Sequence, residues 1–251
     1  MTKEYFRAHG TQRFDTKNRR QIRLMGQDAR FRKLSEQWSV ESLQHQYPHH
    51  FTWLGRPIIQ FPQDIVAMQE IIWKVKPQVV LETGIARGGG LIFYASILEM
   101  LGAGGEAVGI EIALRKHNRS ALQNHPLSKR IKVINGSSVD ADVARRVHDH
   151  IEGRRAVVIL DSNHTYEHVK AELNLYQDLV QKGSYLVVSD TFLEYFPKGY
   201  FRNRPWDKGN NPATAVDEFI RTNKRFTRDD EMAVKLGITA CPTGYLKCVR
   251  S

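Results

Sequence analysis

An apolar run that ends in an acid and a glycine-rich turn begins the most regular part of the chain: residues 79–90 read VVLETGIARGGG. The run predicts a buried strand over 79–83, and the apolar residues after the glycines predict a helix over 91–101. Such strand-loop-helix units bind nucleotides in open α/β sheets, because the loop lets a ligand approach the backbone and the helix offers unpaired N–H groups. We therefore expect a nucleotide-type ligand at this turn.

The acid and the glycine spacing indicate which ligand suits the turn. Glu82 at the strand end would repel a pyrophosphate. Ala86 stands where G-x-G-x-x-G requires its second glycine, and the sequence holds no G-x-x-x-x-G-K-[ST] phosphate loop. S-adenosylmethionine carries an ammonium and a sulfonium but no phosphate, so an acid suits it. The alternative interpretation is an ordinary strand-to-helix turn that needs flexible residues.

Strand-like runs and helical segments alternate after this turn. We expect further strands over 107–112, 131–135, 156–161 and 184–190, each preceded by a segment long enough for a crossover helix. This alternation is typical of parallel βαβ units and predicts an α/β, doubly wound, Rossmann-like sheet. A long polar loop over 191–212 and a helix over 213–223 then lead to a last strand over 245–249.

The charge of the chain is concentrated at its beginning. Of 251 residues, 37 are Lys or Arg and 27 are Asp or Glu, a formal net charge of +10. Residues 1–50 hold ten of these bases and five of these acids, and we expect a basic N-terminal arm of short helices. The main domain, residues 51–251, would begin with an extended, packed loop over 51–62 and a helix over 63–75. This distribution argues against a nucleic-acid ligand for the main domain and leaves room for peripheral membrane contact through the arm.

The sequence shows neither a disulfide framework nor a targeting segment. Its two cysteines, Cys241 and Cys248, lie near the end, and the N-terminus lacks the apolar stretch of a signal peptide. No uncharged apolar run is long enough to cross a bilayer. We expect a cytoplasmic protein.

Acids fall at the ends of four predicted strands, where ligands of such sheets bind: Glu82, Glu111, Asp161 and Asp190. Glu111 closes the second strand, where a carboxylate can accept two hydrogen bonds from a ribose diol. The alternative is that it caps the next helix.

Two of these acids follow neighbouring strands and point to a metal. Asp161 and Asp190 can converge on Mg²⁺, which prefers oxygen ligands and would lower the pKa of a substrate hydroxyl. His164 could then accept the hydroxyl proton. Two alternatives stay open: Asp161 caps a helix over 165–181, or Asp161, His164 and His168 bind zinc.

The combination of motifs resembles the cephalosporin hydroxylase and rhamnosyl O-methyltransferase family, whose members depend on S-adenosylmethionine. The resemblance covers about residues 50–248 and rests on WLGRPIIQFPQD at 53–64, the glycine loop, DSNHT at 161–165 with His168, and RPW at 204–206 followed by GNNP at 209–212. It implies a class I methyltransferase domain over 51–251 with a seven-stranded sheet, its last strand antiparallel, and a helical N-terminal extension.

The resemblance also implies the chemistry, an O-methylation of a hydroxyl on a natural product, sugar or glycolipid by a homo-oligomer. Similar members are thought to bind Mg²⁺ through an acid after strand four and an acid pair after strand five. Asp161 and Asp190 match, whereas Ser189 stands at the first position of the pair and is a weaker ligand. The expected cofactor-binding residues are Glu82, Thr83, Gly84, Arg87, Gly88, Gly89, Glu111, Ser137 and Asp161.

The segment 202–212 is a candidate lid over the substrate, because Arg202, Arg204 and Trp206 could stack on and pair with an acidic or aromatic compound. The alternative is a packed surface loop.

Two other functions compete with methyl transfer. A non-haem iron oxygenase needs two histidines and a carboxylate on one face, and the His-x-acid triplet of this chain is His150-Ile151-Glu152, far from the strand-end acids. A basic module for RNA or anionic lipid would explain the charge of the arm but not the acids.

Overall fold

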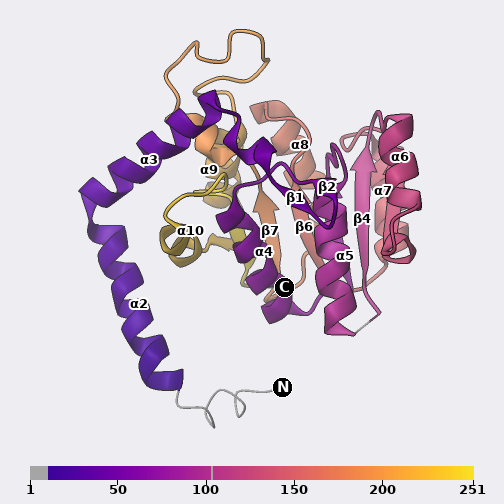
Figure 1. Ribbon diagram of the computed structural model, residues 1–251, viewed down its shortest axis with the longest axis horizontal. Helices are drawn as coiled ribbons and strands as arrows, with labels where there is room; N and C mark the ends of the chain where they lie inside the picture. The colour runs from indigo at the N-terminus through magenta and orange to yellow at the C-terminus, as the bar shows by residue number, and fades with distance from the viewer. Residues whose placement is uncertain (1–10, 103) are drawn as a thin grey trace.

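The computed structural model describes residues 11–102 and 104–251, in which a central sheet is covered by helices on both faces (Figure 1). The strands of this sheet lie in the spatial order β5-β4-β3-β6-β7-β9-β8. Strands β3 to β7 are parallel, and β9 is antiparallel to both of its neighbours. The predicted seven-stranded sheet with an antiparallel last strand is confirmed. The strands are β3 (Val79–Thr83), β4 (Glu106–Glu111), β5 (Ile131–Asn135), β6 (Ala156–Leu160), β7 (Tyr185–Val188), β8 (Phe226–Arg228) and β9 (Tyr245–Cys248).

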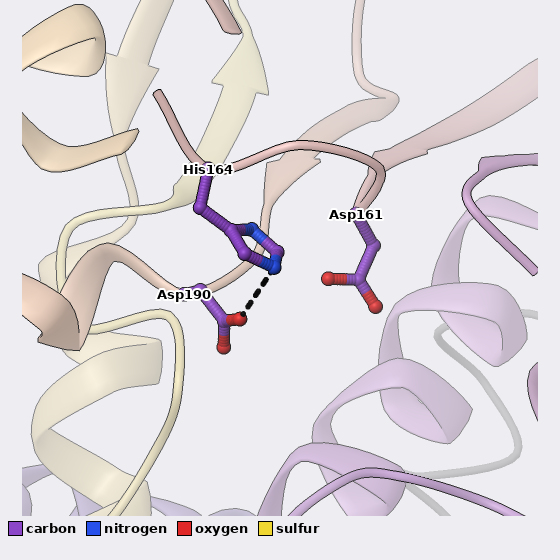
Figure 2. Close-up of side chains that lie close together, drawn as sticks. All are labelled: Asp161, His164 and Asp190. Carbon is purple, nitrogen blue, oxygen red and sulfur yellow. Dashed lines mark ion pairs between the residues drawn. The ribbon is translucent and has the colours of Figure 1, made fainter. Parts of the chain in front are cut away.

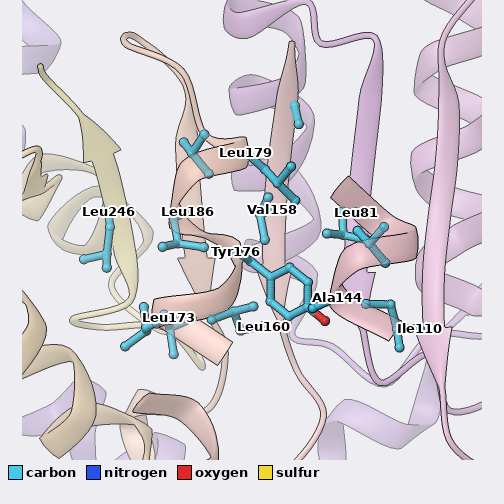
Figure 3. Close-up of a cluster of buried hydrophobic side chains, with 14 of the residues drawn as sticks. Leu81, Ile110, Ala144, Val158, Leu160, Leu173, Tyr176, Leu179, Leu186 and Leu246 are labelled. Atoms are coloured by element: carbon cyan, nitrogen blue, oxygen red, sulfur yellow. The ribbon is translucent and has the colours of Figure 1, made fainter. Parts of the chain in front are cut away.

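Alternation along the central strands supplies both hydrophobic cores. Successive side chains of a strand point to opposite faces, so Leu81 and Val158 face one layer of helices while Val80 and Val157 face the other. Figure 3 shows the first core, where Tyr176 packs over the strands. That layer holds α7 (Ala141–Ile151), α8 (Tyr166–Tyr176) and α9 (Pro212–Thr222); the opposite layer holds α4 (Pro62–Val75), α5 (Gly89–Leu101) and α10 (Asp230–Leu236), with α6 (Lys116–Gln123) beside it.

The N-terminal arm is more regular than the sequence predicted. Helix α2 (Thr11–Gln27) and helix α3 (Ala29–Gln44) take the place of short helices, and the Asp28 side chain between them caps α3 by accepting from the Phe31 N–H at 3.0 Å. The first ten residues of the predicted arm lie outside the described part. The predicted loop over 51–62 contains a small hairpin of β1 (Thr52–Trp53) and β2 (Arg56–Pro57).

None of the helices in the described part combines the length and the apolar character needed to cross a bilayer.

The chain between β7 and β9 also departs from the prediction. Residues Thr191–Tyr195 form a 3-10 helix, η4, at the start of the expected polar loop, and Phe192, Leu193 and Phe196 are buried. Strand β8 and helix α10 were not predicted, because three and seven residues are too few to show a period. The other short helices are η1 (Tyr47–His50), η2 (Ser128–Arg130) and η3 (Gln177–Leu179).

A buried carboxylate joins the beginning of the domain to its end. Asp64, in the first turn of α4, accepts hydrogen bonds from the hydroxyls of Thr239 and Tyr245 and, at 2.8 Å, from the Ala240 N–H. Burial raises the pKa of Asp64 to about 6, although these hydrogen bonds lower it. Asp64 therefore fixes α4 against β9.

Replacing Asp64 with alanine should destabilise the protein by about 2 to 4 kcal/mol, because three buried donors would lose their acceptor. The free energy of unfolding from urea titration measures this loss. Asp149→Ala removes an exposed acid and is the control, expected within about 0.5 kcal/mol of wild type. Equal stability of the two variants would contradict the role given to Asp64.

Candidate active site

The glycine turn after β3 lies directly against the turn after β6. Gly84 has φ of +77°, and a Cβ at this position would collide with the backbone of Asp161. The Asp161 N–H in turn donates to the Thr83 carbonyl at 3.1 Å and to the Thr83 hydroxyl at 3.2 Å. Gly89 approaches the carbonyl of Pro57 just as closely. The glycines therefore let three segments of the chain meet at the carboxyl edge of the sheet.

Glu82 is a buried acid at the end of β3. Its side chain is 3% exposed and accepts a hydrogen bond from the Tyr94 hydroxyl at 3.1 Å. Burial, opposed by the Tyr94 hydrogen bond and aided by the charge of Glu111, raises the pKa of Glu82 to about 8. Without a cation nearby, this carboxyl is mostly protonated at neutral pH. A cationic ligand would favour its charged form.

Asp161, His164 and Asp190 converge from the turns after β6 and β7 (Figure 2). The Nε2 atom of His164 lies 3.2 Å from Oδ2 of Asp190, and one ligand atom from each of the three residues lies within 4.8 Å of the others. Asp190 has φ of 57°, a left-handed conformation that begins η4. Burial raises the pKa of Asp161 well above its usual range, with further contributions from the charges of Asp190 and Glu82.

This donor set fits a divalent cation. Two carboxylates within one small space repel each other, and a cation between them would remove that repulsion. Ser189, which stands where the family resemblance implies an acid and was expected to be a weaker metal ligand, is buried and donates a hydrogen bond to Asp161, which lowers the pKa of that carboxyl.

The alternative roles considered for these residues do not match their contacts. Asp161 does not cap α8, because the cap is Thr165, held by the Asn163 side chain at 3.0 Å. His168 is not part of a zinc set with Asp161, since its Nε2 lies 2.9 Å from the Ser162 hydroxyl and 3.1 Å from that of Ser138.

The oxygenase alternative is equally unsupported. His150 contacts Glu106 at 2.8 Å, and Glu106 begins β4 at the opposite edge of the sheet from the strand-end acids.

A cavity of about 720 Å³ opens at the same edge of the sheet, a size that suits a drug-sized ligand. A smaller cavity of about 30 Å³ lies under the glycine turn. The large cavity is lined by Gly84, Asp161, His164, Ser189 and Asp190 among the predicted residues; the small one is lined by Glu82, Gly84, Arg87, Gly89 and Asp161.

The other predicted site residues lie outside both cavities. Glu111 is half-buried at the end of β4, and its carboxylate accepts from the Ala113 N–H at 3.1 Å. Ser137 is half-buried in the turn after β5, and Gly88 precedes α5 with φ of +81°. The hydroxyl of Thr83 accepts a hydrogen bond from the Asp161 N–H.

The sequence did not reveal a buried network behind Asp161. The Ser162 hydroxyl donates to the fully buried carboxylate of Glu172 at 2.7 Å, and His168 lies 3.7 Å from the same oxygen. The Tyr176 hydroxyl donates to the Ser138 carbonyl at 2.5 Å. Only the i, i+4 spacing of His168 and Glu172 on α8 could have suggested it.

The strand order, the antiparallel β9 and the acid-rich edge beside a glycine turn define the fold of class I methyltransferases. Solved structures share it: a CmcI structure with Mg and SAM matches with a TM-score of 0.57 at 16% identity, covering 80% of this chain and 78% of that chain. An O-methyltransferase from Bacillus cereus in complex with SAH matches with a TM-score of 0.55 at 16% identity, covering 89% of this chain and 92% of that chain.

Sequence comparison gives the family. The family described as rhamnosyl O-methyltransferase/CmcI matches residues 45–249, and the chain belongs to this family. Rhamnosyl O-methyltransferase of Mycobacterium leprae is 30% identical over 200 residues, 78% of this chain and 82% of that protein. The enzyme of the same name from Mycobacterium tuberculosis is 28% identical over 207 residues, 78% of this chain and 77% of that protein. The chain is accordingly an S-adenosylmethionine-dependent O-methyltransferase.

The ionisation of Glu82 should be visible in the stability of the ligand-free protein. Its pKa is raised from 4.5 to about 8 on folding, so the folded state keeps a proton that the unfolded state has lost between these values. Glu82 therefore contributes stability that falls as pH rises, by up to about 1.4 kcal/mol per pH unit. Glu82→Gln should remove this part of the slope, measured by urea unfolding at pH 5.5 and 7.5. Glu231→Gln, at an exposed acid, should keep the wild-type slope, and a wild-type slope in both variants would contradict the assignment.

Proposed function

We propose that this chain transfers the methyl group of S-adenosylmethionine to a hydroxyl of a natural product, sugar or glycolipid, assisted by Mg²⁺. The observation that best supports the metal and the reaction is the convergence of Asp161, His164 and Asp190 on the wall of a cavity that reaches the glycine turn. The mycobacterial relatives named rhamnosyl O-methyltransferase support the transfer to a hydroxyl oxygen.

The cofactor would occupy the turns after β3 and β4. Glu82 would attract its ammonium group, while the close-packed glycines leave room for its methionine end. Glu111 would accept hydrogen bonds from the ribose. One of its carboxylate oxygens accepts from the Ala113 N–H, and the other would face the ribose. Gly84, Arg87, Gly88, Gly89 and Ser137 would complete the site, and Thr83 would keep the turns after β3 and β6 together.

The acceptor would bind beside the turns after β6 and β7. Asp161 and Asp190, with Ser189 as a neutral neighbour, would hold Mg²⁺, which supplies a template and Lewis acidity for the hydroxyl oxygen. His164 would take the hydroxyl proton, because its Nε2 borders the same space. Methyl transfer mainly requires alignment, and the turns that carry these side chains would provide it.

The cytoplasmic location, the homo-oligomer and the membrane contact of the arm stay predictions.

Binding of S-adenosylmethionine tests the cofactor site. Glu82→Gln should weaken it by about tenfold or more, because a charged partner of the ammonium is lost. The wild-type affinity should rise between pH 6 and pH 8, because the ammonium binds the ionised form of a carboxyl whose pKa is about 8. Calorimetry measures both effects. Undiminished binding by Glu82→Gln, or affinity that does not change with pH, would contradict the role of Glu82.

Asp161→Asn tests the metal site. The variant should keep its affinity for S-adenosylmethionine within about threefold but lose measurable Mg²⁺ binding, because one of two charged ligands becomes neutral. Calorimetry of each ligand separates these effects, with Asp149→Asn as the exposed control. Turnover at the wild-type rate by Asp161→Asn would show that the metal-assisted step is wrong.

A further inference from the structure

One side of the large cavity is an aromatic wall. Phe61 and Phe192 have ring centroids 5.7 Å apart, and Tyr200 and Phe201 pack on the ring of Phe196, which is buried and does not line the cavity, with centroids 4.8 and 4.9 Å away. Leu43 and Pro48, from the end of the arm, line the same cavity, together with Trp206 and both Tyr200 and Phe201. A flat unsaturated ring would stack on this wall.

The segment that supplies much of this wall, residues 196–209, presents unpaired cations. It is the orange loop at the top of Figure 1. The two acids that hold the segment are committed to it: Glu194 accepts from Asn211 at 2.6 Å and from the Gly209 N–H at 3.0 Å, and Asp207 accepts from the Gly199 N–H at 2.7 Å. Four bases of the segment make no side-chain hydrogen bond or ion pair with the residues that the structure describes: Lys198, Arg202, Arg204 and Lys208.

Arg204 is the base of this group that reaches the cavity. No other Lys or Arg of the described chain lines it. Its guanidinium lies 5.2 Å from the centre of the Trp206 ring, and that ring meets His164 edge-on at 4.7 Å. Trp206 thus contacts both the Arg204 guanidinium and His164 of the cluster with Asp161 and Asp190. The cavity therefore holds acids and one base that share Trp206 as a neighbour.

We propose that the acceptor is a hydroxylated aromatic or otherwise flat unsaturated compound that carries a carboxylate, and that Arg204 binds this carboxylate. The proposal rests on the proposed methyl transfer and narrows its substrate class. The ring would lie against Trp206 and Tyr200, with the hydroxyl at Asp161 and Asp190 and the carboxylate on the guanidinium. The other unpaired bases of the segment would raise the association rate of an anion.

The test compares a carboxylate ligand with its uncharged methyl ester and with a sugar. The 251-residue protein with S-adenosylhomocysteine and Mg²⁺ is titrated by calorimetry with 3,4-dihydroxycinnamate, with its uncharged methyl ester, and with methyl rhamnoside. Wild type should bind the acid about tenfold or more tightly than the ester, as expected for one charge-assisted contact, and the rhamnoside most weakly. Arg204→Met should bind acid and ester equally, and Arg204→Lys should keep part of the preference. Arg202→Met, on the same segment but not lining the cavity, should keep all of it.

The outcomes separate this proposal from the methyl-transfer proposal. Equal binding of acid and ester by wild type, a preference for the rhamnoside, or no binding of any probe by a protein that binds S-adenosylhomocysteine would overturn the acceptor class alone. Failure of S-adenosylhomocysteine itself to bind would overturn the proposed function. Loss of the acid preference in Arg202→Met as well as in Arg204→Met would assign it to the general charge of the segment rather than to Arg204.

Discussion

The repulsion among carboxylates at one edge of the sheet is the constraint on which this site depends. Glu82, Asp161 and Asp190 end neighbouring parallel strands, so the topology of the sheet brings them together. Burial raises the pKa of Glu82 and Asp161, and the charges of Asp190 and Glu82 add to the shift of Asp161. The ligand-free edge is therefore held partly protonated. Cations that bind there gain both new contacts and relief of this repulsion, which favours an ammonium, a sulfonium or a divalent metal over any phosphate.

The glycines of the turn pack directly against the residues that carry the carboxylates. Gly84 brings the turn after β3 against the backbone of Asp161, and a side chain on Gly90 would collide with the carboxylate of Glu82. The glycine turn thus serves first to pack three backbone segments around two acids. This explains why its spacing differs from a dinucleotide-binding loop, since the glycines lie where the chain meets itself as well as where a ligand would approach.

The sequence predicted the parts of the fold that carry a period, and missed those that do not. Strands β3 and β6 are fully buried apolar runs, and their order along the chain placed Asp161 beside the glycine turn. The neighbouring ends of β6 and β7 made the approach of Asp161 and Asp190 predictable in the same way. No pattern joins Asp64 to Tyr245 or Glu82 to Tyr94, because these contacts depend on how separate elements pack. Strand β8 and the buried aromatic residues after β7 were missed because these segments are too short to show a hydrophobic repeat.

The cavity extends the electrostatic argument to the acceptor. In the proposed complex, the acceptor would place its hydroxyl among the acids and Mg²⁺, and its remaining atoms would lie against rings and one guanidinium. Asp207 of the segment 196–209 and Glu194 just before it accept hydrogen bonds from the backbone of the segment, whereas its bases make no side-chain hydrogen bond or ion pair with the described residues. Desolvation of Arg204 by a bound ring would be costly without an anion on it. The same physical rule therefore applies at both ends of the site: a charge that the fold leaves unpaired selects a ligand of the opposite sign.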